Sequence, residues 1–192
     1  MSTEYFNFEI NIPKLMQRFS NKPFPDLAGA LERGMKKGLE DFRQQAEIKL
    51  IQILSDYSLL NTGIPRQIKT EIIDNGISIQ LTGEGGDEYN YAVFVEFGTG
   101  VIGENSQHPK ASEHGWVYDS HGHGEAGWWY PTDAGDPNPT TKLSKNGWVA
   151  FTRGQVSRPF MYDLWLWATQ SATNIVNKNI RAEFRRLERD YK

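Results

Sequence analysis

The chain of 192 residues contains no cysteine, which excludes disulfide frameworks, thiol catalysis, cysteine zinc fingers and iron–sulfur clusters. It also has no excess of basic residues, because 21 Lys and Arg stand against 24 Asp and Glu, a formal net charge of −3. Proteins that bind nucleic acid through their bulk charge are normally basic, so only a local basic surface could do so here. No apolar run approaches the roughly 18–20 residues that a membrane helix needs, and residues 1–4 do not begin a signal peptide. We therefore expect a soluble protein of a reducing cytoplasm, without a membrane partner.

Aromatic residues, by contrast, are abundant and unevenly placed. They make up 12% of the chain, and residues 101–154 hold four of the six tryptophans, all four histidines and eight of the 18 glycines. Long segments of this kind are usually functional or disordered, and the aromatic content argues against disorder. Basic charge is concentrated elsewhere: residues 155–192 carry seven basic and four acidic groups, a net +3, and form the only basic region.

Two long amphipathic helices are indicated by apolar residues that recur every three or four positions. The first covers residues 27–57, with Asp26 as its expected N-cap. Within it, Gly34 and Gly38 either allow another backbone to approach closely or mark an irregular helix start. The second helix begins at Arg158–Pro159 and ends close to the C-terminus. Its final turns are rich in arginine, which either complements the helix dipole or contacts nucleic-acid phosphates.

Four segments show the composition of β-strands. Residues 5–12 alternate between apolar and polar side chains, which predicts a half-buried strand. Residues 68–73 and 77–81 flank Asn75–Gly76, a strong signal for a hairpin. Residues 89–97 are apolar on both faces, so we expect a central strand there. The predicted fold is α+β, with an antiparallel meander packed against the two helices, in a single domain over residues 1–192 that has residues 101–154 inserted.

The inserted segment offers candidates for binding. We expect short strands at residues 116–118 and 148–151. Between them, the aromatic run Trp128–Pro131 either forms a subunit contact, where Trp and Tyr are enriched, or packs on its own domain, or stacks against a sugar. Its tryptophans gain little from exposure to water, so burial at a contact between subunits is the favoured interpretation.

The four histidines are the best candidates for metal binding. They are His108, His114, His121 and His123, with Glu113, Asp119 and Glu125 nearby. On a strand, His121 and His123 would lie on one face, as two ligands of a shared metal would. Their spacing matches no established ligand pattern, and a glycine-rich loop is a poor rigid site. Solvated loop histidines are the simpler interpretation, and we expect no metal or other cofactor.

Two glycine-rich runs, residues 83–86 and 98–100, lack the neighbours that a phosphate-binding loop needs. We interpret both as turns, and we predict a positive φ at Gly98 or Gly100, because the chain must turn sharply out of a buried strand. Glu96 is the one charged residue in the apolar run at residues 89–97. We expect it to reach solvent or to pair across a subunit contact, or else to be an ordinary carboxylate at a strand end.

The long helix and four short segments together resemble one protein family. The segments are Phe8–Ile12, Asn61–Gly63, the run Tyr-Ala-Val-Phe-Val-Glu-Phe-Gly-Thr-Gly at Tyr91–Gly100, and Gly154–Tyr162. Their order and content resemble the head–tail joining or tail-completion proteins of long-tailed bacteriophages, and the third segment is the most specific. The resemblance covers most of residues 5–190. The family has shorter loops in place of residues 101–154, so the resemblance assigns no role to that segment.

The resemblance implies a structural protein of the virion neck or tail, with no catalysis. It implies a homohexameric ring around the DNA channel, in contact with other neck and tail tube proteins, and assembly in the host cytoplasm. Separate acidic and basic regions could supply the complementary faces of such a ring. The motif turn is then Glu96, Phe97, Gly98, Thr99 and Gly100, and the candidate subunit interface is Trp116, Trp128, Trp129, Tyr130, Trp148, Arg158, Pro159 and Phe160. Two alternatives remain: a metal-dependent enzyme built on the four histidines, and a carbohydrate-binding module built on Trp128 and Trp129.

Overall fold

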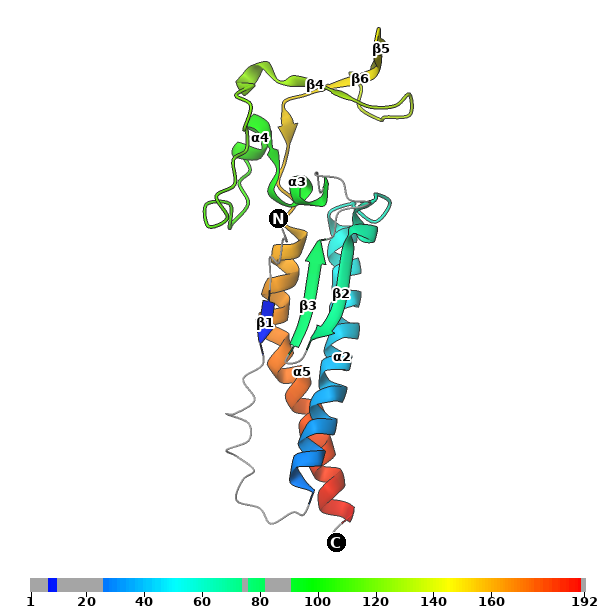
Figure 1. Ribbon diagram of the computed structural model, residues 1–192, viewed down its shortest axis with the longest axis vertical. Helices are drawn as coiled ribbons and strands as arrows, with labels where there is room; N and C mark the ends of the chain where they lie inside the picture. The colour runs from blue at the N-terminus through cyan, green and yellow to red at the C-terminus, as the bar shows by residue number, and fades with distance from the viewer. Residues whose placement is uncertain (1–6, 10–25, 74–75, 82–90, 191–192) are drawn as a thin grey trace. The chain divides into compact units, whose positions relative to one another are not determined.

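The computed structural model describes residues 7–9, 26–73, 76–81 and 91–190 (Figure 1). The chain is α+β and divides into two compact units. Residues 1–84 and 160–192 form the first, which we call the helical unit, and residues 85–159 form the second, which we call the aromatic unit. The sequence predicted one domain with an insertion at 101–154; that segment lies within the aromatic unit, which also takes in the motif Tyr91–Gly100.

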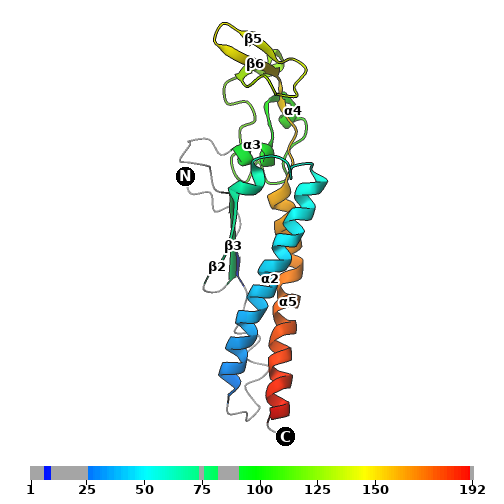
Figure 2. The ribbon, with the colours of Figure 1, turned by 90° about the vertical axis from the view of Figure 1, so that its right-hand side faces the viewer.

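The helical unit is built on two long helices, and both predicted helices are confirmed. Helix α2 spans Leu27–Asp56 and helix α5 spans Phe160–Asp190, and they run antiparallel, side by side, in Figures 1 and 2. Asp26 occupies the N-cap position of α2, but its side chain makes no capping hydrogen bond. It instead forms an ion pair with Arg33, at 2.8 Å.

Two glycines of α2 let the helices approach closely. A Cβ added to Gly34 would lie 2.7 Å from the Cα of Ile180, and one added to Gly38 would lie 2.9 Å from the Cα of Val176. Both distances are to backbone atoms, which cannot rotate away as a side chain can. The close-approach interpretation of these glycines is therefore the correct one.

Hydrogen bonds also join α2 and the residue that follows it, Tyr57, to α5. The hydroxyl of Tyr57 donates to Asp163 Oδ2 at 2.7 Å. The Asn179 amide donates to Asp41 Oδ2 at 3.0 Å, and this hydrogen bond and that from Gln45 lower the pKa of the Asp41 carboxyl. Such hydrogen bonds satisfy polar groups that lie beside a buried apolar seam.

A three-stranded antiparallel sheet completes the helical unit. Its strands are β1 (Asn7–Glu9), β2 (Ile68–Ile73) and β3 (Gly76–Leu81), in the order β1-β3-β2. The predicted hairpin of β2 and β3 is confirmed, whereas the rest of the predicted strand 5–12, the residues between β2 and β3, and the turn at 83–86 lie outside the described residues. A short 3-10 helix at Ile64–Gln67 precedes β2. Thr70 Oγ1 of β2 donates to Glu47 Oε1 of α2 at 2.6 Å.

The predicted central strand at 89–97 is wrong, because Tyr91–Phe97 forms helix α3 of the aromatic unit. Periodicity cannot separate a short apolar run in a buried strand from one in a buried helix. Gly98 follows the last residue of the helix, and its N–H donates to Phe94 O at 2.8 Å. Its φ of 79° is the left-handed conformation that glycine commonly adopts after the C-terminus of a helix. Gly100 has a φ of 60°. The predicted positive φ is confirmed, although the chain turns out of a helix and not a strand.

The rest of the aromatic unit contains short elements and a second antiparallel sheet. These are α4 (Gly100–Glu104), a 3-10 helix (Gly124–Ala126), β4 (Trp128–Pro131), β5 (Lys142–Ser144), β6 (Gly147–Thr152) and β7 (Gly154–Gln155). The sheet has the order β4-β6-β5. The predicted strand at 148–151 is confirmed by β6, whereas residues 116–118 do not form a strand. No helix in the described parts of the chain is long and apolar enough to cross a bilayer.

Candidate functional site

The structure brings together two motif segments that are far apart in the sequence. The backbone N–H of Arg158 donates to Val95 O at 2.9 Å, and the hydroxyl of Ser157 donates to Glu96 O at 2.7 Å. Isolated β-bridges add the pairs Thr99 with Gln155 and Gly100 with Gly154. We call residues 95–100 and 154–158 the motif platform. Its backbone hydrogen bonds close the loop that contains residues 101–153.

Glycine is required where the two segments of the platform, residues 95–100 and 154–158, meet. A Cβ on Gly98 would lie 2.7 Å from the backbone N of Ser157. A Cβ on Gly154 would overlap the carbonyl of Thr99. Both glycines have positive φ, at 79° and 109°. Any other residue would therefore be strained at these positions by both its backbone and its contacts.

One residue of the platform, Glu96, belongs to a buried pair of polar side chains. Glu96 is 2% exposed and His108 is 3% exposed, and Glu96 Oε1 lies 3.0 Å from His108 Nε2. The Lys110 N–H donates to His108 Nδ1 at 3.0 Å, which assigns the imidazole proton to Nε2 and makes it the donor to Glu96. The expectation that Glu96 reaches solvent, a neighbouring subunit or an ordinary strand end is thus corrected, as its partner lies within its own chain. Burial without that partner would be costly.

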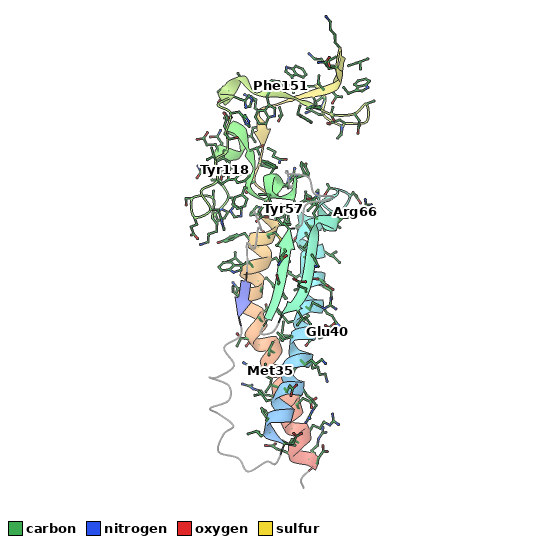
Figure 3. All side chains as sticks on the ribbon, viewed as in Figure 1. Met35, Glu40, Tyr57, Arg66, Tyr118 and Phe151 are labelled. Carbon is green, nitrogen blue, oxygen red and sulfur yellow. The ribbon has the colours of Figure 1, made fainter. Side chains whose placement is uncertain are left out.

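Aromatic rings surround this pair. The ring of Phe97 has its centroid 4.3 Å from that of His108, 4.9 Å from that of Trp116 and 5.6 Å from that of His114. Trp116 Nε1 also donates to Gly98 O at 3.1 Å. Tyr118, labelled in Figure 3, accepts a hydrogen bond from the His108 N–H at 2.9 Å. Trp116, a candidate for the subunit interface, therefore packs within its own unit.

The four histidines were the candidates for metal binding. His121 and His123 lie close together, with ring centroids 5.6 Å apart. Asp119 accepts hydrogen bonds from the N–H groups of Gly124 and His123, and these lower the pKa of its carboxyl. Across the described residues, no three side chains of His, Asp or Glu gather as metal ligands would. The interpretation as solvated loop histidines is wrong for His108, which is buried.

The sheet of the aromatic unit presents side chains on two faces, as its register shows. One face carries Trp129, Pro131, Lys142, Val149 and Phe151. Trp129 is 47% exposed, its ring centroid lies 5.4 Å from that of Phe151, and the Lys142 ammonium lies 3.7 Å from the Trp129 centroid. This ammonium position is favourable over an aromatic face.

The hairpin of β5 and β6 exposes an apolar pair on the other face. Leu143 and Trp148 are direct cross-strand partners, 66% and 37% exposed. We call residues 142–148 the hairpin tip. Sequence reasoning missed β5, although Asn146–Gly147 is the same hairpin signal that was interpreted correctly at Asn75–Gly76.

Hydrogen bonds hold the segment between β4 and β5 against the sheet. The Tyr130 hydroxyl donates to Asp136 Oδ2 at 3.1 Å. Burial, followed by the hydrogen bond to Asp136 and the charge of that carboxylate, raises the pKa of Tyr130 above its usual value. Asn138 Nδ2 donates to Phe151 O at 3.0 Å, and Thr140 Oγ1 accepts from the Phe151 N–H at 2.8 Å. The polar groups near the hairpin tip are therefore engaged within the unit.

The candidate interface residues differ in how much of each side chain is exposed to solvent. Trp129 and Trp148 are exposed. Trp128, Tyr130, Arg158 and Pro159 are half-buried, and Trp128 packs beside His123 with ring centroids 4.9 Å apart. Phe160 has no exposed surface, which removes it from the candidate interface.

The aromatic unit therefore combines a rigid motif platform with an exposed apolar hairpin tip. Among the described residues, every buried side-chain nitrogen or oxygen atom has a hydrogen-bond partner, whereas Leu143 and Trp148 at the hairpin tip are exposed. Comparison of the chain with family models, with curated proteins and with solved structures finds no match in any of the three.

Proposed function

We propose that this chain is a structural protein of a bacteriophage neck, which joins the tail to the filled head and assembles with copies of itself into a ring. The observation that carries the proposal is the pairing of the two motif segments. Tyr91–Gly100 and Gly154–Tyr162 carry the resemblance to tail-completion proteins, and residues from both build the motif platform. Six-fold symmetry and the neighbouring neck and tail tube proteins come from that resemblance.

The chemistry of the platform favours a scaffold over a catalyst. Its glycines are required for backbone packing, and Glu96 and His108 are buried and paired with each other. A general acid or base must come within hydrogen-bond reach of a substrate, and side chains at 2% and 3% exposure offer no such access. The platform therefore has a structural role, in which it joins the two ends of the segment 101–153.

The hairpin tip is the best surface for a neighbouring copy. Leu143 and Trp148 expose apolar area on adjoining strands, and exposed apolar groups gathered in this way mark interaction surfaces. Lys142 and Lys145 lie beside them, so the receiving surface is expected to be apolar with acidic groups at its rim. A closed ring needs this kind of heterologous contact, in which each copy offers one surface and receives another.

The test replaces the apolar pair at the tip. In the phage that encodes the protein, Leu143→Ser with Trp148→Ser should give filled heads and free tails in lysates, because the contact between copies loses its apolar core. The matched control is Val117→Ser, which removes another exposed apolar side chain of the same unit, 63% exposed, outside both the tip and the platform. Electron microscopy of the lysates counts joined particles.

A second variant separates loss of contact from loss of folding. Leu143→Glu changes the more exposed residue of the apolar pair, at 66%, and should leave the circular dichroism spectrum and melting temperature of the purified protein unchanged. It should still prevent joining, since the new charge would be buried at the contact. Joined, infectious particles from both tip variants would contradict the proposal.

The two alternatives make different predictions. A metal-dependent enzyme would contain a stoichiometric transition metal that is lost with His121→Ala and His123→Ala. A carbohydrate-binding module would bind glycans through Trp128 and Trp129, yet the Lys142 ammonium already covers one face of the Trp129 ring, 3.7 Å from its centroid. Elemental analysis of the purified protein and a glycan array test them directly.

A further inference from the structure

Three arginines form a line along the last helix. Arg181, Arg185 and Arg189 are spaced by four residues on α5, and all three are exposed. Side chains four apart lie on the same side of a helix, and the buried residues Ile180 and Phe184 lie on the opposite side, against α2. We call Arg181, Arg185 and Arg189 the arginine ladder.

The ladder differs from the neighbouring arginine on the same helix. Arg186 lies 4.0 Å from both Glu183 and Asp190 and is compensated by them. Within the described part of the chain, no ion pair includes a ladder arginine. One carboxylate, Glu188, borders the same shallow hollow as Arg185 and Arg189. The ladder therefore keeps a positive surplus that the ion pairs of the described residues do not neutralise.

The helix dipole does not account for the whole ladder. Favourable interaction of cations with the dipole falls off within the last turn. Helix α5 ends at Asp190, so Arg189 lies in the last turn. Arg181 lies eight residues before Arg189, which is more than two helical turns. Like charges four apart also destabilise an isolated helix. Their alignment is thus a cost to the helix unless a negatively charged partner offsets it.

We propose that the arginine ladder binds the phosphate backbone of nucleic acid, without reading its sequence. Four residues advance a helix by about 6 Å, so the ladder presents three guanidinium groups over about 12 Å. Each guanidinium matches a phosphate with two parallel hydrogen bonds. A regular row of identical cations fits a polymer with regularly repeated anions better than the irregular carboxylates of a protein surface. The chain as a whole is acidic, at −3, so contact is confined to this face.

The test measures how binding depends on salt. The probe is a fluorescein-labelled random-sequence 30-base-pair DNA, titrated by anisotropy with the full chain to about 0.5 mM, because non-specific dissociation constants are typically about 10⁻⁴–10⁻⁶ M. Three phosphate contacts predict a slope of about −2.7 in a plot of log affinity against log salt. Affinity should therefore fall about 40-fold between 50 and 200 mM salt.

Three variants assign the binding to the ladder. Arg181→Gln, Arg185→Gln and Arg189→Gln combined should abolish detectable binding, with the helical circular dichroism signal retained. Arg186→Gln, a paired arginine of the same helix, should leave affinity within about twofold, because that position supplies no free phosphate contact. A charge-matched control, Arg66→Gln with Lys69→Gln and Arg153→Gln, removes three exposed cations elsewhere and should also retain binding.

Three results would overturn the proposal. They are no DNA binding by the unaltered chain at 50 mM salt, equal loss in the charge-matched control, and unchanged binding by the ladder variant. Salt-sensitive self-association that is lost in the ladder variant, without DNA binding, would assign the ladder to an acidic protein surface instead. The proposal goes beyond the neck function and stands or fails separately, because tip variants do not alter the ladder.

Discussion

At the scale of single residues, the aromatic unit depends on two buried polar side chains that satisfy each other. Glu96 comes from α3 and His108 from the loop after α4, twelve positions later. Each would be costly to bury alone, and together they fix the distance between the helix and the loop. Sequence patterns could not reveal the pair, because residues twelve apart meet only when the intervening chain has a known path. The one available signal was a single carboxylate in an apolar run.

Removing one partner of this pair should destabilise the aromatic unit. His108→Leu is expected to cost about 1–3 kcal/mol, since the buried Glu96 would lose its hydrogen bond to the imidazole. Glu96→Gln should cost much less, because the amide oxygen can still accept from Nε2. Urea unfolding of the purified chain measures both. Exposed Glu113→Gln is the control, and a His108→Leu midpoint equal to that of the unaltered protein would show that the pair is dispensable.

At the scale of elements, the two long helices were predictable and the short apolar ones were not. Helices α2 and α5 repeat apolar residues every three or four positions over many turns, so their periodicity is unambiguous. Helix α3 has seven residues, too few to show a period, and its β-branched and aromatic content favoured a strand. The arrangement of β1 beside β3 was also hidden, because strand order depends on long-range pairing.

The contact between α2 and α5 yields a prediction that opposes helix propensity. Alanine normally stabilises a helix over glycine by about 1 kcal/mol. Gly34→Ala should nevertheless destabilise the protein by about 1–3 kcal/mol, because its Cβ would press on the backbone of Ile180. Gly29→Ala is the matched control on the same helix, as its Cβ would meet only the movable side chain of Asp26. Thermal unfolding compares them, and a higher midpoint for Gly34→Ala would contradict the close contact.

At the scale of the whole molecule, the sequence predicted the α+β class but not the division into two units. Composition alone located the unusual segment at residues 101–154, since its aromatic and glycine content differs from the rest. The true limits, 85 and 159, depend on where the contacts of the folded chain become sparse. The exposed pair Leu143 and Trp148 escaped notice for a related reason, because only the register of β5 and β6 places them together.

The division predicts that the helical unit folds by itself. Replacing residues 85–159 with a flexible linker of about ten Gly and Ser residues should retain both long helices and a cooperative unfolding transition. The hydrogen bonds of Tyr57 with Asp163 and of Asn179 with Asp41 lie within that unit. Far-UV circular dichroism and thermal melting provide the readout. A product without cooperative unfolding would mean that the helical unit needs the aromatic unit to fold.

The motif platform has a consequence for how the chain can change over evolution. Its bridges between Thr99 and Gln155 and between Gly100 and Gly154 hold the two ends of a long excursion side by side. A segment whose ends are already clamped can lengthen or shorten with little penalty, because loop-closure entropy grows only with the logarithm of length. The platform is therefore a site at which different inserted segments can be exchanged, each with a new surface for a new neighbour, while the sequences of helices α2 and α5 stay the same.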